Sequence, residues 1–212
     1  MKKIIELSNE EARKHFIKGG SYFNADFPSY ISFEPILTEV SKIINGRNIS
    51  DFQSAHPSGF SGVNYSFLTN KDGKFAWRPL ELIHPALYVS IVNEICQSTN
   101  WNMIQSRIHE FESDSVECCS IPVIPQDGLS DTATQIKSWW QKIEQQSLIY
   151  SLEFSHVLHT DVVDCYGSLY THSISWAIHG IDEAKNNKRN TAFLGNKIDS
   201  FVQAGRFGQT NG

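Results

Sequence analysis

Two carboxylates within an apolar stretch are the residues of this sequence best suited to chemistry. The stretch HTDVVDC, which begins at His159, places Asp161 and Asp164 on either side of Val162 and Val163. An unpaired carboxylate is costly on a buried strand, so it needs a partner. Carboxylate and carbonyl oxygens suit Mg²⁺, and two such ions about 3.5–4 Å apart assist phosphoryl transfer. The pattern therefore indicates a divalent-ion site, although Asp-x-x-Asp alone more often marks a capped turn.

Histidines offer a second chemistry in the same region. His156, His159, His172 and His179 flank Asp161, and histidines with carboxylates are typical ligands of zinc. No His-Glu-x-x-His motif is present, and the spacing of His156 and His159 puts their side chains on opposite faces of a strand. A zinc hydrolase built on His156, His159 and His172 is therefore the weaker interpretation of these residues.

A cationic hairpin is predicted upstream of these residues. Asp72-Gly73 is a tight-turn dipeptide between the β-favouring stretches NYSFLT and KFAW. The turn would place Lys71, Lys74 and Arg78 near its tip and on its second strand. A hairpin that projects cations can clamp phosphate groups, and a merely solvated hairpin is the alternative.

Composition and charge are those of an ordinary soluble protein. The chain has 212 residues, of which 40% are hydrophobic and 19% charged, and its formal net charge is -5. This acidic balance does not favour a nucleic-acid binder, although a basic stripe can lie on an acidic protein. A second basic group, Lys185, Lys188 and Arg189, is interpreted as a solvated loop. No apolar run approaches the roughly 20 residues of a membrane span, and the start is no signal peptide, so we expect a cytoplasmic protein.

Mostly helical elements are expected to position these motifs. Ser8, with Glu11 three residues on, predicts a capped N-terminal helix. The clearest helical period begins at residue 130 or 131, and it places Trp139 and Trp140 in the core. A strand is expected over residues 155–163. Further helices are expected over residues 1–18, 33–46, 85–96, 101–111 and 173–179.

Two of these motifs together resemble a known enzyme family. The segment TDVVDCYGSLYTHS resembles the first catalytic segment of reverse transcriptases, in which a strand-borne Asp is followed five residues later by an aromatic residue. The segment KDGKFAWRPL is similar to the fingers hairpin of the same enzymes, and it stands in the same order along the chain. Three segments further resemble bacterial reverse transcriptases of abortive infection and phage defence: DCYGSLYTHSISWAIHG, LGNKID and GQTNG.

The resemblance implies a set of site residues. Asp161 would be the catalytic carboxylate that binds Mg²⁺, or Mn²⁺ in its place, with the backbone carbonyl of Val162 as a further metal ligand. Tyr166 would pack under the incoming sugar and screen for its 2′-hydroxyl. Asp164 falls where the backbone lies near the triphosphate, so its side chain would be structural. The implied nucleotide-binding residues are Lys71, Arg78, Val162 and Tyr166, with Lys74 and Asp164 as additional candidates.

The resemblance also implies a fold and an activity. We expect an α+β fold with the fingers of a right-hand polymerase, mostly helical with one β-hairpin, over residues 1–154. The first palm segment would span residues 155–174, and a second fingers segment would span residues 175–212. The implied activity is template-directed nucleotidyl transfer, in which an RNA template directs DNA synthesis from deoxynucleoside triphosphates. A structured non-coding RNA is a further implied partner.

The sequence departs from the family pattern at the second carboxylate segment. No Asp-Asp pair occurs in the chain, and no Pro-Gln-Gly follows GQTNG. We therefore expect the chain alone to be inactive, with the rest of the palm and the thumb supplied by the same gene or by a partner chain. The alternative from another functional class is a non-catalytic module for nucleic acid or nucleotides, in which Lys71, Arg78 and Trp77 bind by charge and stacking.

Overall fold

The computed structural model combines helices with a small sheet. It describes residues 2–23, 28, 30–45, 47, 49–52, 55–70, 73–74, 77–112, 117–125, 131–163, 165 and 167–210. The described residues are 55% helical, and they form one two-stranded antiparallel sheet. This mixture of helix and sheet is compatible with an α+β fold. None of the helices in the described part of the chain is both long and apolar enough to cross a membrane.

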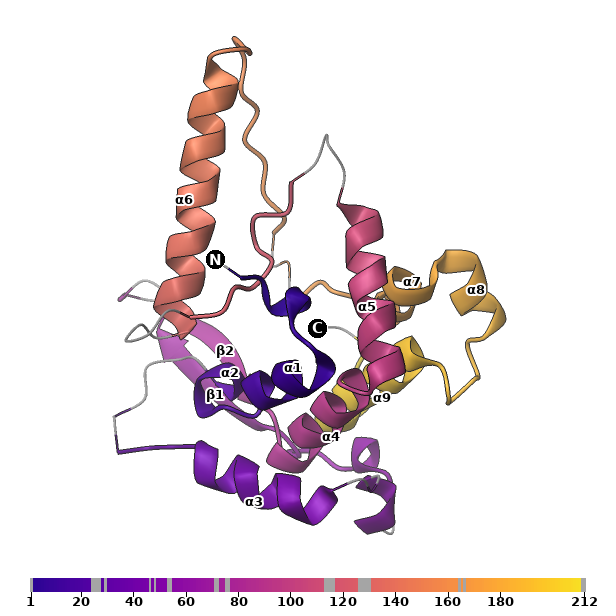
Figure 1. Ribbon diagram of the computed structural model, residues 1–212. Helices are drawn as coiled ribbons and strands as arrows, with labels where there is room; N and C mark the ends of the chain where they lie inside the picture. The colour runs from indigo at the N-terminus through magenta and orange to yellow at the C-terminus, as the bar shows by residue number, and fades with distance from the viewer. Residues whose placement is uncertain are drawn as a thin grey trace.

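Figure 1 shows the arrangement of the helices and strands. The helices are α1 (Asn9–Phe16), α2 (Gly19–Tyr22), α3 (Glu34–Ile44), α4 (Pro85–Ile95), α5 (Ser98–Phe111), α6 (Asp131–Ser151), α7 (Ser173–His179), α8 (Ile181–Asn186) and α9 (Leu194–Gly205). The strands are β1 (Tyr65–Asn70) and β2 (Trp77–Leu82). Short 3-10 turns occupy Ile4–Glu6, Ile49–Phe52 and Pro57–Gly59. The helices predicted near α3, α4, α5, α6 and α7 are confirmed within a few residues at their ends.

The N-terminal segment forms the predicted capping box. Ser8 Oγ accepts a hydrogen bond from the Glu11 backbone N–H at 3.2 Å, and the Ser8 N–H donates to the Glu11 carboxylate at 3.0 Å. The box starts α1 after Ser8 because it satisfies backbone donors that a helix end leaves open. The helix expected over residues 1–18 is therefore too long. Residues Ile4–Glu6 form a 3-10 turn instead, and Lys3 pairs with Val123 in an isolated β-bridge.

The predicted hairpin forms between β1 and β2. Their antiparallel register pairs Asn70 with Trp77 beside the turn. Gly73 lies in the turn with a φ of +77°, a backbone conformation that favours glycine. The side-chain oxygen of Asn70 accepts a hydrogen bond from the Gly73 N–H at 2.8 Å. The Asp of the Asp-Gly dipeptide lies outside the described residues, so the turn is defined here from Asn70 and Gly73.

Helix α4 lies between two clusters of buried apolar side chains. Val92 belongs to the first cluster with Trp101, whose indole N–H donates to the Leu7 carbonyl at 2.8 Å. Val89 belongs to the second cluster with Leu37 of α3. The first cluster consists of Ile4, Ile5, Leu7, Ala12, Val92, Cys96 and Trp101. The second consists of Tyr22, Leu37, Ile44 and Val89.

Helices α7 and α9 pack closely because Gly195 has no side chain. A Cβ added at Gly195 would lie 2.4 Å from the Cα of Ser175. The Gly195 N–H donates to Nε2 of His179 at 3.1 Å, and the His179 ring stacks on Phe193 with the ring centroids 3.6 Å apart. Helix α9 also contacts α4, so this C-terminal group of helices is joined to the core.

The strand expected over residues 155–163 is wrong. These residues are irregular, and Leu158 and Val163 are 89% and 87% exposed. Within the described part of the chain, no strand pairs with them. A strand is stable only where its backbone groups and one of its faces find partners, and neither is supplied here.

The expectation that Trp139 and Trp140 lie in the core is also wrong. The two side chains are 39% and 51% exposed, and their rings contact each other with centroids 5.1 Å apart. Figure 1 shows the reason: α6 projects away from the body formed by the other helices and the hairpin. A helical period predicts an apolar face, but it does not say whether another element covers that face.

The contact between α7 and α9 predicts a stability effect of Gly195→Ala. The added Cβ would overlap the backbone of Ser175, so we expect the free energy of unfolding to fall by about 1–3 kcal/mol. Urea unfolding followed by circular dichroism measures this change. Gly59→Ala is the control, because a Cβ there meets no described atom within 4 Å, and its effect should stay within about 0.5 kcal/mol. Equal effects of the two substitutions would contradict the close packing.

Candidate functional site

Asp161 lies on an exposed segment that joins the end of α6 to α7. Figure 1 shows this segment returning beside α6 toward the body of the molecule. The carboxylate of Asp161 accepts a hydrogen bond from the Val162 N–H at 2.8 Å, and the Val162 side chain is exposed. The structure therefore gives Asp161 a local backbone contact in place of a strand. Asp164 and Tyr166 lie outside the described residues.

Asp161 and the carbonyl of Val162 are oxygen donors of the kind that Mg²⁺ prefers. A carboxylate with a neighbouring backbone carbonyl is a suitable donor set, because Mg²⁺ keeps several waters and takes one or two carboxylates with substrate phosphates. A two-ion site needs further carboxylates. In the described part of the chain, no group of three or more His, Cys, Asp or Glu side chains is arranged to hold a metal ion. Asp161 with the carbonyl of Val162 therefore offers one anchor of such a site.

The histidines considered for zinc have separate partners. His156 contacts Ser155 Oγ at 2.9 Å, whereas Nδ1 of His172 is paired with the carboxylate of Asp199. No metal-ligating cluster that includes either of them, or His159, occurs among the residues that the structure describes. The geometry therefore gives the zinc hydrolase interpretation no support.

The hairpin brings cations to the turn end of the sheet. Arg78 pairs with Thr69 in the register, and its guanidinium has no ion-pair partner in the described part of the chain. Lys74 is exposed in the turn, and Lys71 lies outside the described residues. Adjacent strand residues point to opposite faces, so Arg78 and Trp77 lie on different faces of the hairpin. No hydrogen bond or ion pair between described residues joins Arg78 to Asp161.

A cavity that the sequence did not predict lies among the C-terminal helices. It has a volume of about 1010 Å³ and is lined by residues of α4, α7, α8 and α9 and of the loop between α8 and α9. Residues around His56 and Pro57 complete the wall. The lining combines aromatic side chains, such as Tyr170 and Trp176, with amides and cations. This mixture is typical of a small-molecule site, which is concave and has a few placed polar groups.

Positive charge prevails in this cavity. The two carboxylates in its lining are already paired: Lys197 Nζ donates to Glu94 at 2.6 Å, and Asp199 binds His172. Three further cations in the lining have no ion-pair partner in the described part of the chain. They are Lys185, Lys188 and Arg189. The cavity therefore favours an anionic ligand on a chain whose formal net charge is -5.

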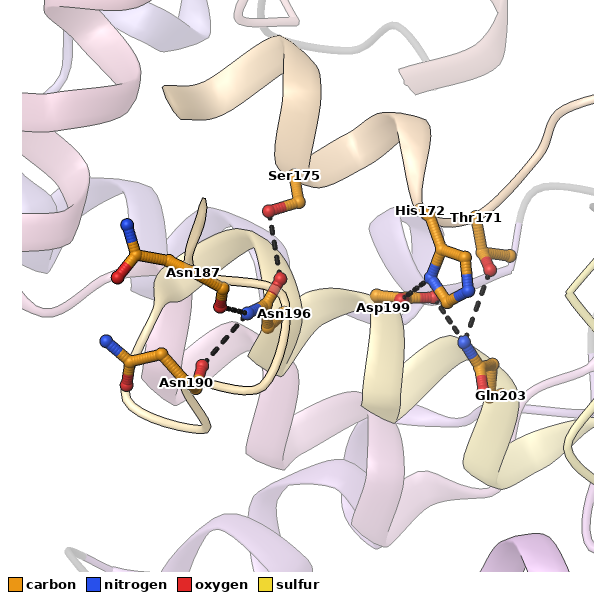
Figure 2. A network of polar contacts seen from close by, with 8 residues as sticks. All are labelled: Thr171, His172, Ser175, Asn187, Asn190, Asn196, Asp199 and Gln203. Atoms are coloured by element: carbon orange, nitrogen blue, oxygen red, sulfur yellow. Dashed lines mark hydrogen bonds and ion pairs between the residues drawn. The ribbon is translucent and has the colours of Figure 1, made fainter. Parts of the chain in front are cut away.

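A polar network holds the loop that carries two of these cations, Lys188 and Arg189. Figure 2 shows the side chain of Asn196 donating to the backbone carbonyls of Asn187 and Asn190, at 2.9 Å in each case. Ser175 Oγ donates in turn to the Asn196 side-chain oxygen at 2.9 Å. Asn196 therefore ties the loop to both α7 and α9.

A second part of the network orients His172. The Asp199 carboxylate accepts a hydrogen bond from Nδ1–H of His172 and another from Gln203 Nε2, the latter at 2.6 Å. Gln203 Nε2 also lies 3.4 Å from Thr171 Oγ1. With Nδ1 committed to Asp199, the other ring nitrogen of His172 is the one left for a ligand. Figure 2 shows these four side chains meeting where α9 passes the start of α7.

Sequence reasoning missed this site for two reasons. The sequence contains a basic group, Lys185, Lys188 and Arg189, but a short run of cations on its own predicts only a solvated loop. The available signal was the spacing of Asn196, Asp199 and Gln203, which places three polar side chains on one face of α9. A polar stripe on an amphipathic helix marks its solvent side as readily as a site, so the spacing alone does not distinguish them.

Comparisons with known proteins do not identify a family for this chain. Neither the protein-family models nor the curated proteins give a match to this chain.

Burial of His179 predicts a pH effect on stability. Burial lowers the pKa of His179 below its ordinary value of 6.5, with Glu183 opposing the shift. The unfolded chain then binds the proton more readily than the folded chain. The contribution of neutral His179 to the free energy of unfolding is therefore fully present above pH 6.5, and it is lost as the pH falls through the folded-state pKa. Protonation would also remove the acceptor used by the Gly195 N–H.

Urea unfolding above and below pH 6.5 measures this effect. His179→Gln is the matched variant, because its amide oxygen can accept from Gly195 and does not titrate. We expect the free energy of unfolding to fall less steeply with acidity in this variant than in the unmodified protein. If the free energy of unfolding depends on pH in the same way in both proteins, His179 is not the source of the pH effect.

Proposed function

We propose that this chain is part of a template-directed nucleotidyltransferase of the reverse-transcriptase type, acting in anti-phage defence. RNA would be its template and deoxynucleoside triphosphates its substrates. The observation that carries the proposal is the presence of KDGKFAWRPL and TDVVDCYGSLYTHS, in that order, on one chain. A mostly helical body with a two-stranded hairpin is compatible with the fingers of such an enzyme.

The hairpin would bind the triphosphate. Arg78 is exposed near the start of β2, beside the turn, and its guanidinium has no ion-pair partner in the described part of the chain. An unpaired guanidinium can form two parallel hydrogen bonds to phosphate oxygens. Lys71 and Lys74 would add charge at the turn.

Asp161 would be a metal-binding carboxylate of the reaction centre. Its carboxylate and the carbonyl of Val162 would help to hold Mg²⁺ or Mn²⁺, which neutralises charge on the phosphates. Positioning and charge neutralisation account for most of the catalysis in phosphoryl transfer, so a single well-placed carboxylate has a large effect. Tyr166 would contact the sugar, and Asp164 would support the segment.

The exposed apolar side chains near Asp161 support the proposal that this segment binds another protein segment. Val157, Leu158, Val162 and Val163 are all exposed. Contiguous exposed apolar groups are typical of an interaction surface, and this run has the β-favouring composition of a strand. We propose that the remaining palm, from the same gene or from a partner chain, pairs with this run and supplies the further carboxylates.

Primer extension tests the proposal directly. The purified 212-residue chain should show no magnesium-dependent extension, because the described part of the chain offers one anchor at Asp161 and no metal-ligating cluster. In the protein or complex that supplies the second carboxylate segment, Asp161→Asn should lower the rate at least about 100-fold. Asp182→Asn, an exposed Asp on α8, is the matched control and should leave the rate unchanged. Extension by the isolated chain, or full activity of Asp161→Asn, would each count against the proposal.

A second candidate is a non-catalytic module that binds single-stranded nucleic acid. The observation that favours it is Trp77, which is 62% exposed on the hairpin next to the exposed Arg78. An exposed aromatic ring offers a stacking surface for a base, and the neighbouring cation offers a contact to the backbone phosphate. The two side chains lie on opposite faces, so the strand would pass over the edge of the hairpin.

Binding of a labelled single-stranded RNA distinguishes the two candidates. A base stacked on Trp77 contributes about 1–3 kcal/mol, so Trp77→Ala should weaken binding about 5- to 150-fold. Asp161→Asn should leave binding unchanged or tighten it, because it removes a negative charge near phosphates. Fluorescence anisotropy measures both. If Asp161→Asn abolishes extension in the assembled protein but preserves binding, catalysis is the function; if Trp77→Ala has no effect, the binding module is excluded.

A further inference from the structure

We propose that the cavity among α4, α7, α8 and α9 binds a nucleoside polyphosphate. This site is separate from the hairpin and from Asp161, and the proposal does not depend on the function assigned to them. It rests on three properties of the cavity: its size, its unpaired positive charge and its preorganised polar wall.

The size of the cavity suits a nucleotide. Its volume of about 1010 Å³ lies at the upper end of the roughly 300–1,000 Å³ range of small-molecule sites. An inorganic phosphate would leave most of this space unused. The aromatic side chains Tyr170 and Trp176 lie in the same lining, with ring centroids 6.1 Å apart, and they give a base an apolar surface.

The charge of the cavity suits a polyphosphate. Lys185, Lys188 and Arg189 are exposed on the wall and have no ion-pair partner among the described residues. The carboxylates that could have neutralised them are engaged elsewhere, since Glu94 binds Lys197 and Asp199 binds His172. Cations that line a concave surface without an ion-pair partner favour an anionic ligand, and three of them suit a chain of phosphates.

The loop that bears Lys188 and Arg189 is held before any ligand arrives. Asn196 fixes the backbone at Asn187 and Asn190 on either side of Lys188 and Arg189. A ligand therefore does not need to order the loop, which lowers the entropic cost of binding. The neutral groups of Thr191, Ser200 and Gln203 in the same wall can bond to a sugar or to a base.

Charge-removal variants of the full chain test the site. Isothermal titration calorimetry with ATP, GTP, CTP and UTP should detect binding, and the double variant Lys188→Gln/Arg189→Gln should weaken it at least about tenfold. The matched control, Lys14→Gln/Lys18→Gln, removes the same charge from exposed positions outside the cavity lining and should change binding less than about twofold. Both variants should fold normally, because the changed side chains are exposed. Equal affinities of the two variants would overturn the proposal.

Two further experiments test which part of the nucleotide is recognised and where on the protein it binds. Adenosine should bind much more weakly than ATP, and inorganic tripolyphosphate should compete with ATP but bind less tightly, because it does not use the aromatic wall. Photocrosslinking with 8-azido-ATP, followed by peptide mapping, should label the region from Tyr170 to Gln203 that lines the cavity. Labelling confined to the hairpin, or binding of an oligonucleotide without any binding of mononucleotides, would overturn the proposal. Loss of primer extension in Asp161→Asn with unchanged ATP labelling at the cavity would show that the two sites are independent.

Discussion

The burial of α4 is the constraint on which the other elements depend. Val89 and Val92 of this helix belong to different apolar clusters, one formed with α3 and one with the N-terminal segment and α5. Leu87 is also buried, and it lies in the wall of the C-terminal cavity. A helix with apolar side chains on several faces must be covered on each of them. The N-terminal turn, α3, α5 and α9 are therefore positioned by the need to cover one helix.

The ion pair between Glu94 and Lys197 links this core to the cavity. Glu94 is buried, and it also accepts hydrogen bonds from Asn100, at 2.8 Å to its backbone and 3.1 Å to its side chain. A buried carboxylate is tolerated only with such partners, so Lys197 is required to neutralise it. The pairing joins α9 to α4. It also removes Glu94 as a competitor for the cations on the other side of the cavity.

Many exposed apolar side chains lie on α6 and on the segment that follows it. Trp139 and Trp140 lie on the projecting helix, and Leu158 and Val163 lie on the returning segment. Side chains of this kind are normally covered in a soluble protein, and contiguous patches of them mark interaction surfaces. The catalytic candidate Asp161 is on the same segment, so a partner that covers the patch would also enclose the carboxylate. Assembly and catalysis are therefore coupled in the proposed function.

Features that depend only on neighbouring residues were predictable from the sequence. The capping box of Ser8 and Glu11, the hairpin turn at Gly73 and the helix at residues 173–179 were all predicted, because a cap, a turn and a helical period are each specified within a few residues. The resemblance to reverse transcriptases likewise rests on local motifs, and it remains a prediction.

Whether other elements cover these features depends on the packing of distant parts of the chain. The run Val157–Val163 has the composition of a strand, yet it is exposed because the described residues provide no neighbouring strand. The cavity is formed by Lys185, His172 and Glu94, which are far apart in sequence and meet only because α9 packs against both α4 and α7. Burial and the pairing of charges depend on contacts between distant residues, and no local pattern encodes them.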